Sequence, residues 1–174
     1  MPDLDPSLEI GPSLNLKLFN SADQRQTLEL RLPLRAVITS DFKHVDYQGI
    51  VFQPRLNLDN RNFLGNHGLN LGLAAGPVFA DHRYHQFIYG VDPVYATGDR
   101  PAYQAHGGYA GTQFTAAMSK RFPTYWVGGF LKYDTMKDAT FNDSPLAKFR
   151  HGFTLGIGIS WVFVESITKV QARD

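Results

Sequence analysis

The sequence predicts an all-β protein, an antiparallel transmembrane β-barrel with about eight strands. Two observations predict it: apolar and polar residues alternate repeatedly along the chain, and long and short connections succeed one another between the alternating segments. The length suits one domain over residues 1–174, with strands within about 7–164 and a C-terminal tail at 165–174.

Alternation with a period of two gives each of five segments an apolar face and a polar face. Two further runs, at 109–120 and 124–133, alternate less cleanly, and a short run at 83–91 is ambiguous; we count it as the eighth strand. The apolar positions of the clear segments are Leu8, Ile10, Leu14, Leu16 and Leu18; Leu28, Leu30, Leu32, Leu34, Ala36 and Ile38; Ile50, Phe52, Leu56 and Leu58; Leu69, Leu71, Leu73, Ala75 and Phe79; and Phe153, Leu155, Ile157, Ile159, Trp161 and Phe163.

Three features favour a membrane barrel over a soluble ligand-binding barrel, whose apolar face would point inward. Several runs are as long as a tilted membrane strand, which needs about 9–11 residues. The polar positions are rich in Gly, Ala, Ser and Asn, as expected for a narrow lumen. Aromatic residues gather toward the strand ends, as in interfacial girdles: Phe19, Phe79, Tyr84, Tyr89, Tyr109, Tyr125, Trp126, Tyr133, Trp161 and Phe163.

The connections give an expected orientation. Outer-membrane barrels have short periplasmic turns and long external loops. We therefore place the long loops 134–151 and 92–107, with 59–67, at the external end. The tight turns at 121–124 and 80–82, with the connection 40–46, are then placed at the periplasmic end. Four prolines fall inside predicted strands, where they require bulges or shorter strands: Pro12, Pro33, Pro54 and Pro77.

Composition excludes several classes of protein. The formal net charge of +1 predicts no nucleic-acid partner, and the absence of cysteine excludes disulfides and thiolate chemistry. The most apolar stretches, such as 72–80 and 157–164, are too short for a transmembrane helix. The segment 1–6 carries no signal-peptide features, so we expect the chain to lack the natural beginning of an exported protein.

Several short motifs together resemble the MipA/OmpV family in order and rough spacing across nearly the whole chain. Each motif alone is ordinary turn or strand chemistry. The motifs are Glu9-Ile10-Gly11-Pro12-Ser13-Leu14, Leu32-Pro33-Leu34-Arg35-Ala36-Val37, Tyr89-Gly90-Val91, Tyr103 with Gly107-Gly108-Tyr109-Ala110-Gly111, Asn142-Asp143-Ser144-Pro145-Leu146 and Gly156-Ile157-Gly158-Ile159-Ser160-Trp161-Val162-Phe163.

The resemblance implies a non-enzymatic outer-membrane barrel of a Gram-negative bacterium. Named members of the family are described as scaffolds for a lytic transglycosylase and a peptidoglycan (murein) synthase, and others are linked to osmotic response or adhesion. The partners it implies are outer-membrane lipid and these two periplasmic enzymes, which would face 40–46 and 121–124. Members are longer at the N-terminus, so this chain resembles the C-terminal portion of one. Outer-membrane barrels commonly end on an aromatic residue, whereas here further residues follow Phe163.

The candidate functional residues are charged residues at the polar positions of the alternating segments. We call these positions the polar parity. We expect them to face the lumen, where charges in a low dielectric must be paired. They form either an internal salt-bridge network that plugs a small barrel or the lining of a pore with a preference for anions, and we favour the plug. These lumen-facing residues are Glu9, Lys17, Glu29, Arg31, Arg35 and Arg55.

Catalytic, metal and cofactor sites are not expected. His82 and His85 have a spacing that suits a metal on a helix, but on a strand they would point to opposite faces. One alternative is a lipid hydrolase in which His67, His106 and His151 converge at the outer rim, with a triad of Ser144, Asp143 and His151. Another is an adhesin that uses Tyr95 and Tyr103 of the loop 92–107, although ordinary loop packing is the simpler interpretation.

Overall fold

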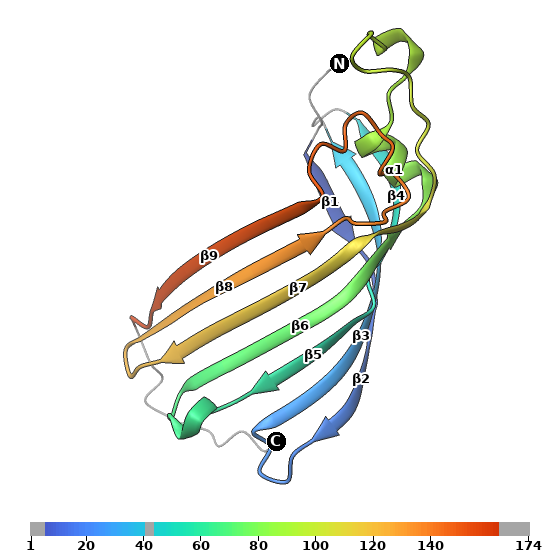
Figure 1. Ribbon diagram of the computed structural model, residues 1–174. Helices are drawn as coiled ribbons and strands as arrows, with labels where there is room; N and C mark the ends of the chain where they lie inside the picture. The colour runs from blue at the N-terminus through green and yellow to red at the C-terminus, as the bar shows by residue number, and fades with distance from the viewer. Residues whose placement is uncertain (1–5, 41–43, 164–174) are drawn as a thin grey trace.

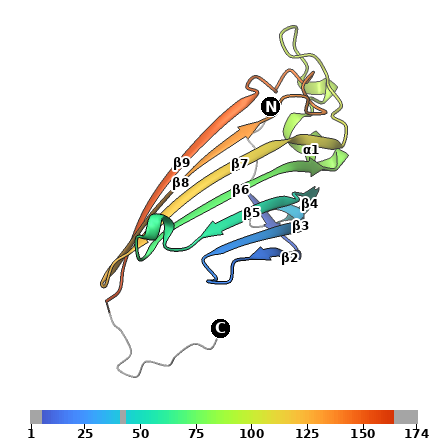
Figure 2. The same ribbon diagram turned by 60° about the horizontal axis from the view of Figure 1, so that its bottom comes forward.

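One antiparallel sheet of nine strands forms the body of the protein in a computed structural model, which describes residues 6–40 and 44–163 (Figure 1). The sheet is strongly curved, as Figure 2 shows. Its order is β1-β3-β4-β6-β7-β8-β9, with β2 also on β3 and β5 between β3 and β6. The strands are β1 (Ser7–Ile10), β2 (Ser13–Asn20), β3 (Gln26–Ser40), β4 (Val45–Phe52), β5 (Arg55–Asn60), β6 (Leu69–Ala80), β7 (Gly108–Arg121), β8 (Tyr125–Thr135) and β9 (His151–Trp161).

The prolines explain why two predicted strands are each divided in two. Pro12 separates β1 from β2, and Pro54 separates β4 from β5, because proline has no N–H to donate to a ladder. Both halves still pair with β3 on their respective sides. Pro33 and Pro77 lie within β3 and β6, and the Pro12 and Pro33 carbonyls accept from Leu34 and Gln53 N–H groups at 3.0 and 3.2 Å.

The register of the strands confirms the predicted alternation. Residues paired across neighbouring strands lie on the same face, so each transverse row is mostly of one chemical kind. One row consists of Leu16, Leu30, Leu56, Ala75, Phe114, Tyr133 and Phe153. The adjacent row on the opposite face consists of Lys17, Glu29, Asn57, Ala74, Thr115, Lys132 and Thr154.

The predicted strand at 83–91 is wrong, because residues His82–Tyr89 form the helix α1. The Asp81 side chain caps this helix by accepting from the Tyr84 N–H at 2.9 Å. A capped helix satisfies its backbone without a neighbouring strand, so this short apolar run leaves the sheet.

Loss of that strand changes which connections share an end of the sheet. Residues 81–107 are a single connection between β6 and β7, at the same end as the β8–β9 connection. The β3–β4 hairpin also lies at this end, although its residues 41–43 are outside the described part of the chain. The prediction that 40–46 and 121–124 share one end is therefore wrong, as is the placement of 59–67 beside the long loops. The opposite end carries 21–25, 61–68 and 122–124 (Figure 1).

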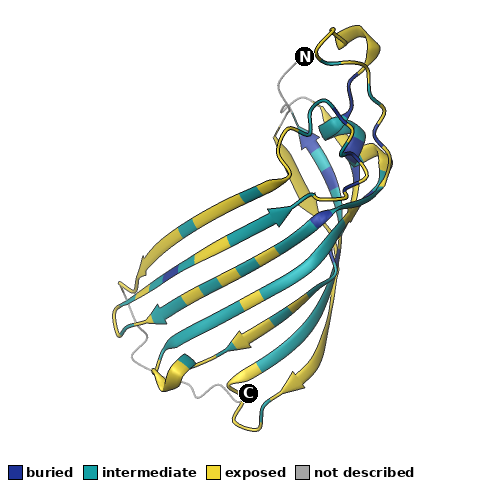
Figure 3. Cartoon of the chain, in the orientation of Figure 1, coloured by how far each residue is buried: buried dark blue, intermediate teal, exposed yellow. Residues whose placement is uncertain are grey.

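Helix α1 packs against the polar-parity face of the sheet at the end with the long connections. Its N-terminus sits directly on Gly49, whose φ is +127° and whose added Cβ would lie 2.2 Å from Asp81 Oδ1. Beside it, Val37, Val51 and Ala80 form a small buried core, with Tyr84 packed against them. Figure 3 shows buried residues gathered near α1 and exposed or intermediate ones along most of the strands.

Within residues 6–40 and 44–163 the sheet has two edges. β9 pairs with β8 alone, and β1 and β2 pair with β3 alone. Over the same residues α1, with eight residues, is the longest helix, and none has the length and apolar character of a membrane span.

Gly76 on β6 is required by a close approach of backbone. An added Cβ would lie 2.1 Å from the Pro54 carbonyl oxygen and 2.7 Å from Arg55 Cα. We expect Gly76→Ala to lower the free energy of unfolding by about 1–3 kcal/mol, as overpacking does. Urea unfolding in detergent micelles, followed by circular dichroism, measures this.

Gly72→Ala is the matched control on the same strand and face, because its Cβ would meet just the Asp59 carboxylate, at 3.3 Å. Equal loss of stability in the two variants would contradict the close approach at Gly76.

Candidate functional site

A chain of polar side chains crosses the concave face of the sheet from β1 to β8. The Arg35 Nε forms an ion pair with Glu9 Oε2 at 2.8 Å, and Arg35 Nη2 donates to Gln53 Oε1 at 2.9 Å. Gln53 Nε2 donates to Gln113 Oε1 at 3.0 Å, and Gln113 Nε2 donates to Asp134 Oδ1 at 2.8 Å. We call these residues, with Lys132, the transverse polar chain; Lys132 Nζ lies 3.3 Å from Asp134 Oδ2.

The backbone positions this chain in two ways. Its members on strands share one parity, so their side chains leave the sheet on the same side. Gln53, between β4 and β5, reaches Gln113 on β7 by passing β6 at Gly76, the register partner of Gln113. A Cβ at position 76 would collide with the backbone of Pro54 and Arg55, which follow Gln53.

The structure accounts for the six predicted charges as follows. Glu9 pairs with Arg35, and Glu29 pairs with Arg31, whose Nε and Nη2 both donate to Glu29 Oε2 at 3.1 and 2.9 Å. Lys17 is the register partner of Glu29, with no ion pair between them. Arg55 has no ion pair or side-chain hydrogen bond with any described residue.

Sequence reasoning missed Gln53, Gln113, Asp134 and Lys132 as site residues. The sequence places Gln53 at a polar position of its segment, as it does Arg55. Its partner Gln113, however, is 60 residues away in the sequence. β7 and β8 alternate poorly, so their inward positions gave a weak signal.

A hollow of about 820 Å³ lies on the same face, toward the end with the short connections. Lys17, Glu29 and Arg31 line one part of it, and Trp126 and Phe130 line another. The predicted girdle position of Trp126 is wrong, because its ring lies over glycines on the polar-parity face. A Cβ on Gly128 would be 2.3 Å from the Trp126 ring, and one on Gly156 would be 2.2 Å from the Phe130 ring.

Other aromatic residues do lie at the strand ends on the apolar face. Phe79 and Tyr109 contact edge to face at 6.0 Å at the end near α1. Tyr133 packs between Phe114 and Phe153 at that end, and Phe122 stacks on Tyr125 at 4.4 Å at the other. Tyr84 and Tyr89, predicted for the girdle, belong to α1 instead.

The long connections form a compact cap centred on His85 of α1. His85 is fully buried, its Nδ1 lies 2.6 Å from the His106 carbonyl oxygen, and the Phe141 ring contacts its ring edge to face at 4.9 Å. Phe141 stacks on Tyr89 at 3.6 Å, so the connections 81–107 and 136–150 are packed together. Burial is the main cause that lowers the pKa of His85 below its usual 6.5, and the neighbouring His82 lowers it further. The His106 carbonyl and Asp81 act in the opposite direction and raise the pKa by less. His85 is therefore neutral at pH 7.

The predicted histidine sites are not assembled. His67 lies at the opposite end from His106 and His151, so the three do not converge. Ser144 is buried and donates to the Tyr89 carbonyl at 2.7 Å, whereas the His151 Nδ1 contacts the Tyr133 hydroxyl at 2.8 Å. His82 and His85 do share a helix, yet both Nδ1 atoms face backbone carbonyls. Across 6–40 and 44–163, no group of three or more His, Asp or Glu could hold a metal ion.

The two loop tyrosines are engaged in local structure. Tyr103 exchanges two backbone hydrogen bonds with Val91, both 2.9 Å, and the Tyr95 carbonyl accepts from Arg100 at 2.9 Å. These contacts use the backbone atoms of the two tyrosines, and Tyr95 is 39% exposed.

Comparison with known families decides the relationship of the chain. The family model described as MltA-interacting protein MipA matches residues 1–163. The chain belongs to the MipA family. Proteins of the MipA family are outer-membrane β-barrels, which agrees with the all-β, antiparallel fold. The predicted resemblance is thus confirmed at the level of the family. No curated protein and no solved structure matches the chain.

The burial of neutral His85 makes the cap sensitive to acid. Because the pKa of His85 is lower in the folded protein than in the unfolded chain, the unfolded chain takes up more protons as the pH falls below about 6.5. We expect the cap to be fully stable above that pH and to lose stability below it. Faster amide hydrogen exchange of 91–105 at about pH 5.5 than at pH 7.5, after correction for intrinsic rates, measures this loss.

His85→Gln should remove most of this pH dependence, and His151→Gln, at an exposed histidine of the same end, should leave it unchanged. An unaltered pH dependence in His85→Gln would show that another group controls the cap.

Proposed function

We propose that the chain forms, or forms part of, a closed β-barrel in the outer membrane of a Gram-negative bacterium. One observation carries this proposal: the sheet has a continuous apolar row on one face and a charged, hydrogen-bonded row on the other, in a family of outer-membrane barrels. The apolar face would contact lipid. Glu9, Lys17, Glu29, Arg31, Arg35 and Arg55 would face the lumen.

The exposed apolar residues support a lipid contact. Leu155, at the middle of β9, is 71% exposed, and its neighbours Phe153 and Ile157 on the same face are similarly exposed. Such a continuous apolar surface is costly in water and favourable in a bilayer.

Loop length suggests the orientation. The connections 21–25, 61–68 and 122–124 are short, as periplasmic turns are, and the opposite end carries two long connections and α1. We therefore place the end with these three short connections in the periplasm. The connection 40–46, which the sequence pattern assigns to the periplasm, then lies at the external end.

We further propose a non-catalytic scaffold role, in which the periplasmic end holds a lytic transglycosylase, as the family name implies, and a murein synthase. The segment 61–68 supplies a surface suited to protein contact. Leu64 is 84% exposed and is held in a left-handed conformation, with φ of +56°, next to Phe63. Exposed apolar side chains on a short, shaped segment are typical anchors of protein interfaces.

A passive pore is the second candidate function. The hollow beside Lys17 and Arg31 favours it, because about 820 Å³ would hold a small hydrated solute. The transverse polar chain argues against free passage, since it crosses the concave face above this hollow. Conductance in a planar bilayer would favour the pore.

Adjacent residues on β9 test the lipid contact. We expect Leu155→Arg to reduce the stability of the folded barrel in lipid vesicles by about 2–4 kcal/mol, because a charge would enter the bilayer. Thr154→Arg, on the opposite face, should cost much less. Heat-modifiable electrophoretic mobility and urea titration report the folded fraction. Equal effects in both variants would contradict the assignment of the faces.

A pair of exposed apolar residues tests the scaffold. We expect Leu64→Asp to reduce the capture of purified lytic transglycosylase by the detergent-solubilised protein about tenfold or more, because an interface anchor contributes at least about 2 kcal/mol. Val94→Asp is the matched control, since Val94 is 80% exposed at the opposite end. Equal capture by wild type and Leu64→Asp, or a loss confined to Val94→Asp, would overturn the assigned surface.

A further inference from the structure

Two arginines lie directly opposite each other on the polar-parity face. Arg31 of β3 and Arg55 of β5 are register partners, which places their Cβ atoms roughly 4.5–5.5 Å apart. Like charges in this position repel and destabilise a sheet. Arg35 lies four residues after Arg31 on the same strand and the same face, and it adds a third positive charge nearby.

The described carboxylates do not neutralise this cluster fully. Glu29 pairs with Arg31, and Glu9 pairs with Arg35. Arg55 has no carboxylate within ion-pair distance among the described residues, and its Nε is buried without a hydrogen-bond partner. The terminal nitrogens of Arg55 also have no acceptor among the described residues, and an anion bound to them would supply one.

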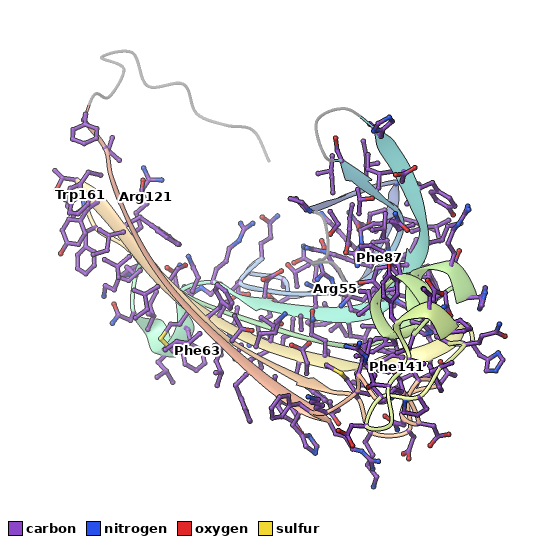
Figure 4. The ribbon with its side chains drawn as sticks, turned by 90° about the horizontal axis from the view of Figure 1, so that it is seen from above. Arg55, Phe63, Phe87, Arg121, Phe141 and Trp161 are labelled. Carbon is purple, nitrogen blue, oxygen red and sulfur yellow. The ribbon has the colours of Figure 1, made fainter. Side chains whose placement is uncertain are left out.

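Open space lies beside Arg31 on the same face, and Arg55 lies next to it without lining that space. Figure 4 shows Arg55 on the inner side of the curved sheet. Arg31 lines the hollow of about 820 Å³ on that face. Arg31 directs Nε and Nη2 at a single oxygen of Glu29, so its other N–H groups are not engaged by that contact.

We propose that Arg31 and Arg55 together bind an oxyanion, the carboxylate or phosphate group of a small solute, on the concave face. Planar guanidinium groups match the paired oxygens of both anions, and chloride lacks that geometry. Lys17, which lines the same hollow, is the register partner of Glu29 and not of either arginine, and it is not part of the site. The proposal goes beyond the scaffold role and does not depend on any protein partner.

The test uses the full chain folded in detergent micelles, titrated with inorganic phosphate and with acetate against sodium chloride at equal ionic strength. We expect a saturable rise in the midpoint of thermal unfolding with phosphate, acetate or both, because an anion that binds the folded state stabilises it. Isothermal titration calorimetry with the same probes gives the dissociation constant. Phosphate alone would assign the site to phosphate groups, and both anions would assign it to oxyanions generally.

Three variants identify the residues. Arg55→Gln should weaken binding about tenfold or more, and Arg55→Lys, which keeps the charge without the planar fork, should weaken it to a smaller extent. Lys17→Gln, the matched control, removes a charge from the same face and should change the dissociation constant less than about twofold. If Arg55→Gln does not fold, Arg55→Lys still separates the geometry from the charge.

Two results would overturn the proposal. One is equal stabilisation by chloride, acetate and phosphate, which would mean screening alone. The other is an equal loss of anion binding in Lys17→Gln and Arg55→Gln, which would mean a diffuse positive field. Neither result affects the capture of a lytic transglycosylase, so this proposal and the scaffold role fail independently.

Discussion

The antiparallel register of β3 (Gln26–Ser40) is the constraint on which the rest of the sheet depends. This strand pairs with β1 and β2 on one side and with β4 and β5 on the other, so it fixes four strands at once. A shift of one residue would exchange the two faces, placing Arg31 among leucines and Leu30 among charges. The alternation of large apolar and charged residues along β3 makes that exchange very costly, so register shifts by an odd number of residues are strongly disfavoured.

The all-β class and the two faces could be predicted because they depend on local alternation, which the sequence displays directly. Leu28 to Leu34 and Phe153 to Ile159 each carry an apolar residue at every second position, and both segments are strands. The helix α1 could not be predicted in the same way. Its stability comes from the Asp81 cap and from packing of Tyr84 and His85 against distant segments, and a window of eight residues does not contain that information.

The wrong strand at 83–91 changed the predicted connections at both ends of the sheet. Counted back from the C-terminus, one strand added or removed reverses the direction of every strand before it in the chain. It explains why 59–67 and 40–46 exchange ends although their strands were identified correctly. Parity alone places Glu9, Arg35, Glu29 and Arg31 on one face of the sheet, where the structure pairs Glu9 with Arg35 and Glu29 with Arg31. The contact of Arg35 with Gln53, and those that continue through Gln113 to Asp134, required knowledge of which strands are neighbours. The transverse polar chain passes β6 at Gly76, which carries no polar signal.

The glycines of β8 and β9 have an optical consequence. Trp126 lies on the polar-parity face, where Gly128 and Gly158 leave room for its indole ring, whereas Trp161 is the register partner of Tyr125 on the apolar face. The protein has two tryptophans, and each reports on one side of the sheet. In the proposed barrel their fluorescence would respond separately, Trp161 to quenchers carried in lipid chains and Trp126 to quenchers dissolved in water. The chain thus carries a pair of native spectroscopic probes, one on each face of the sheet.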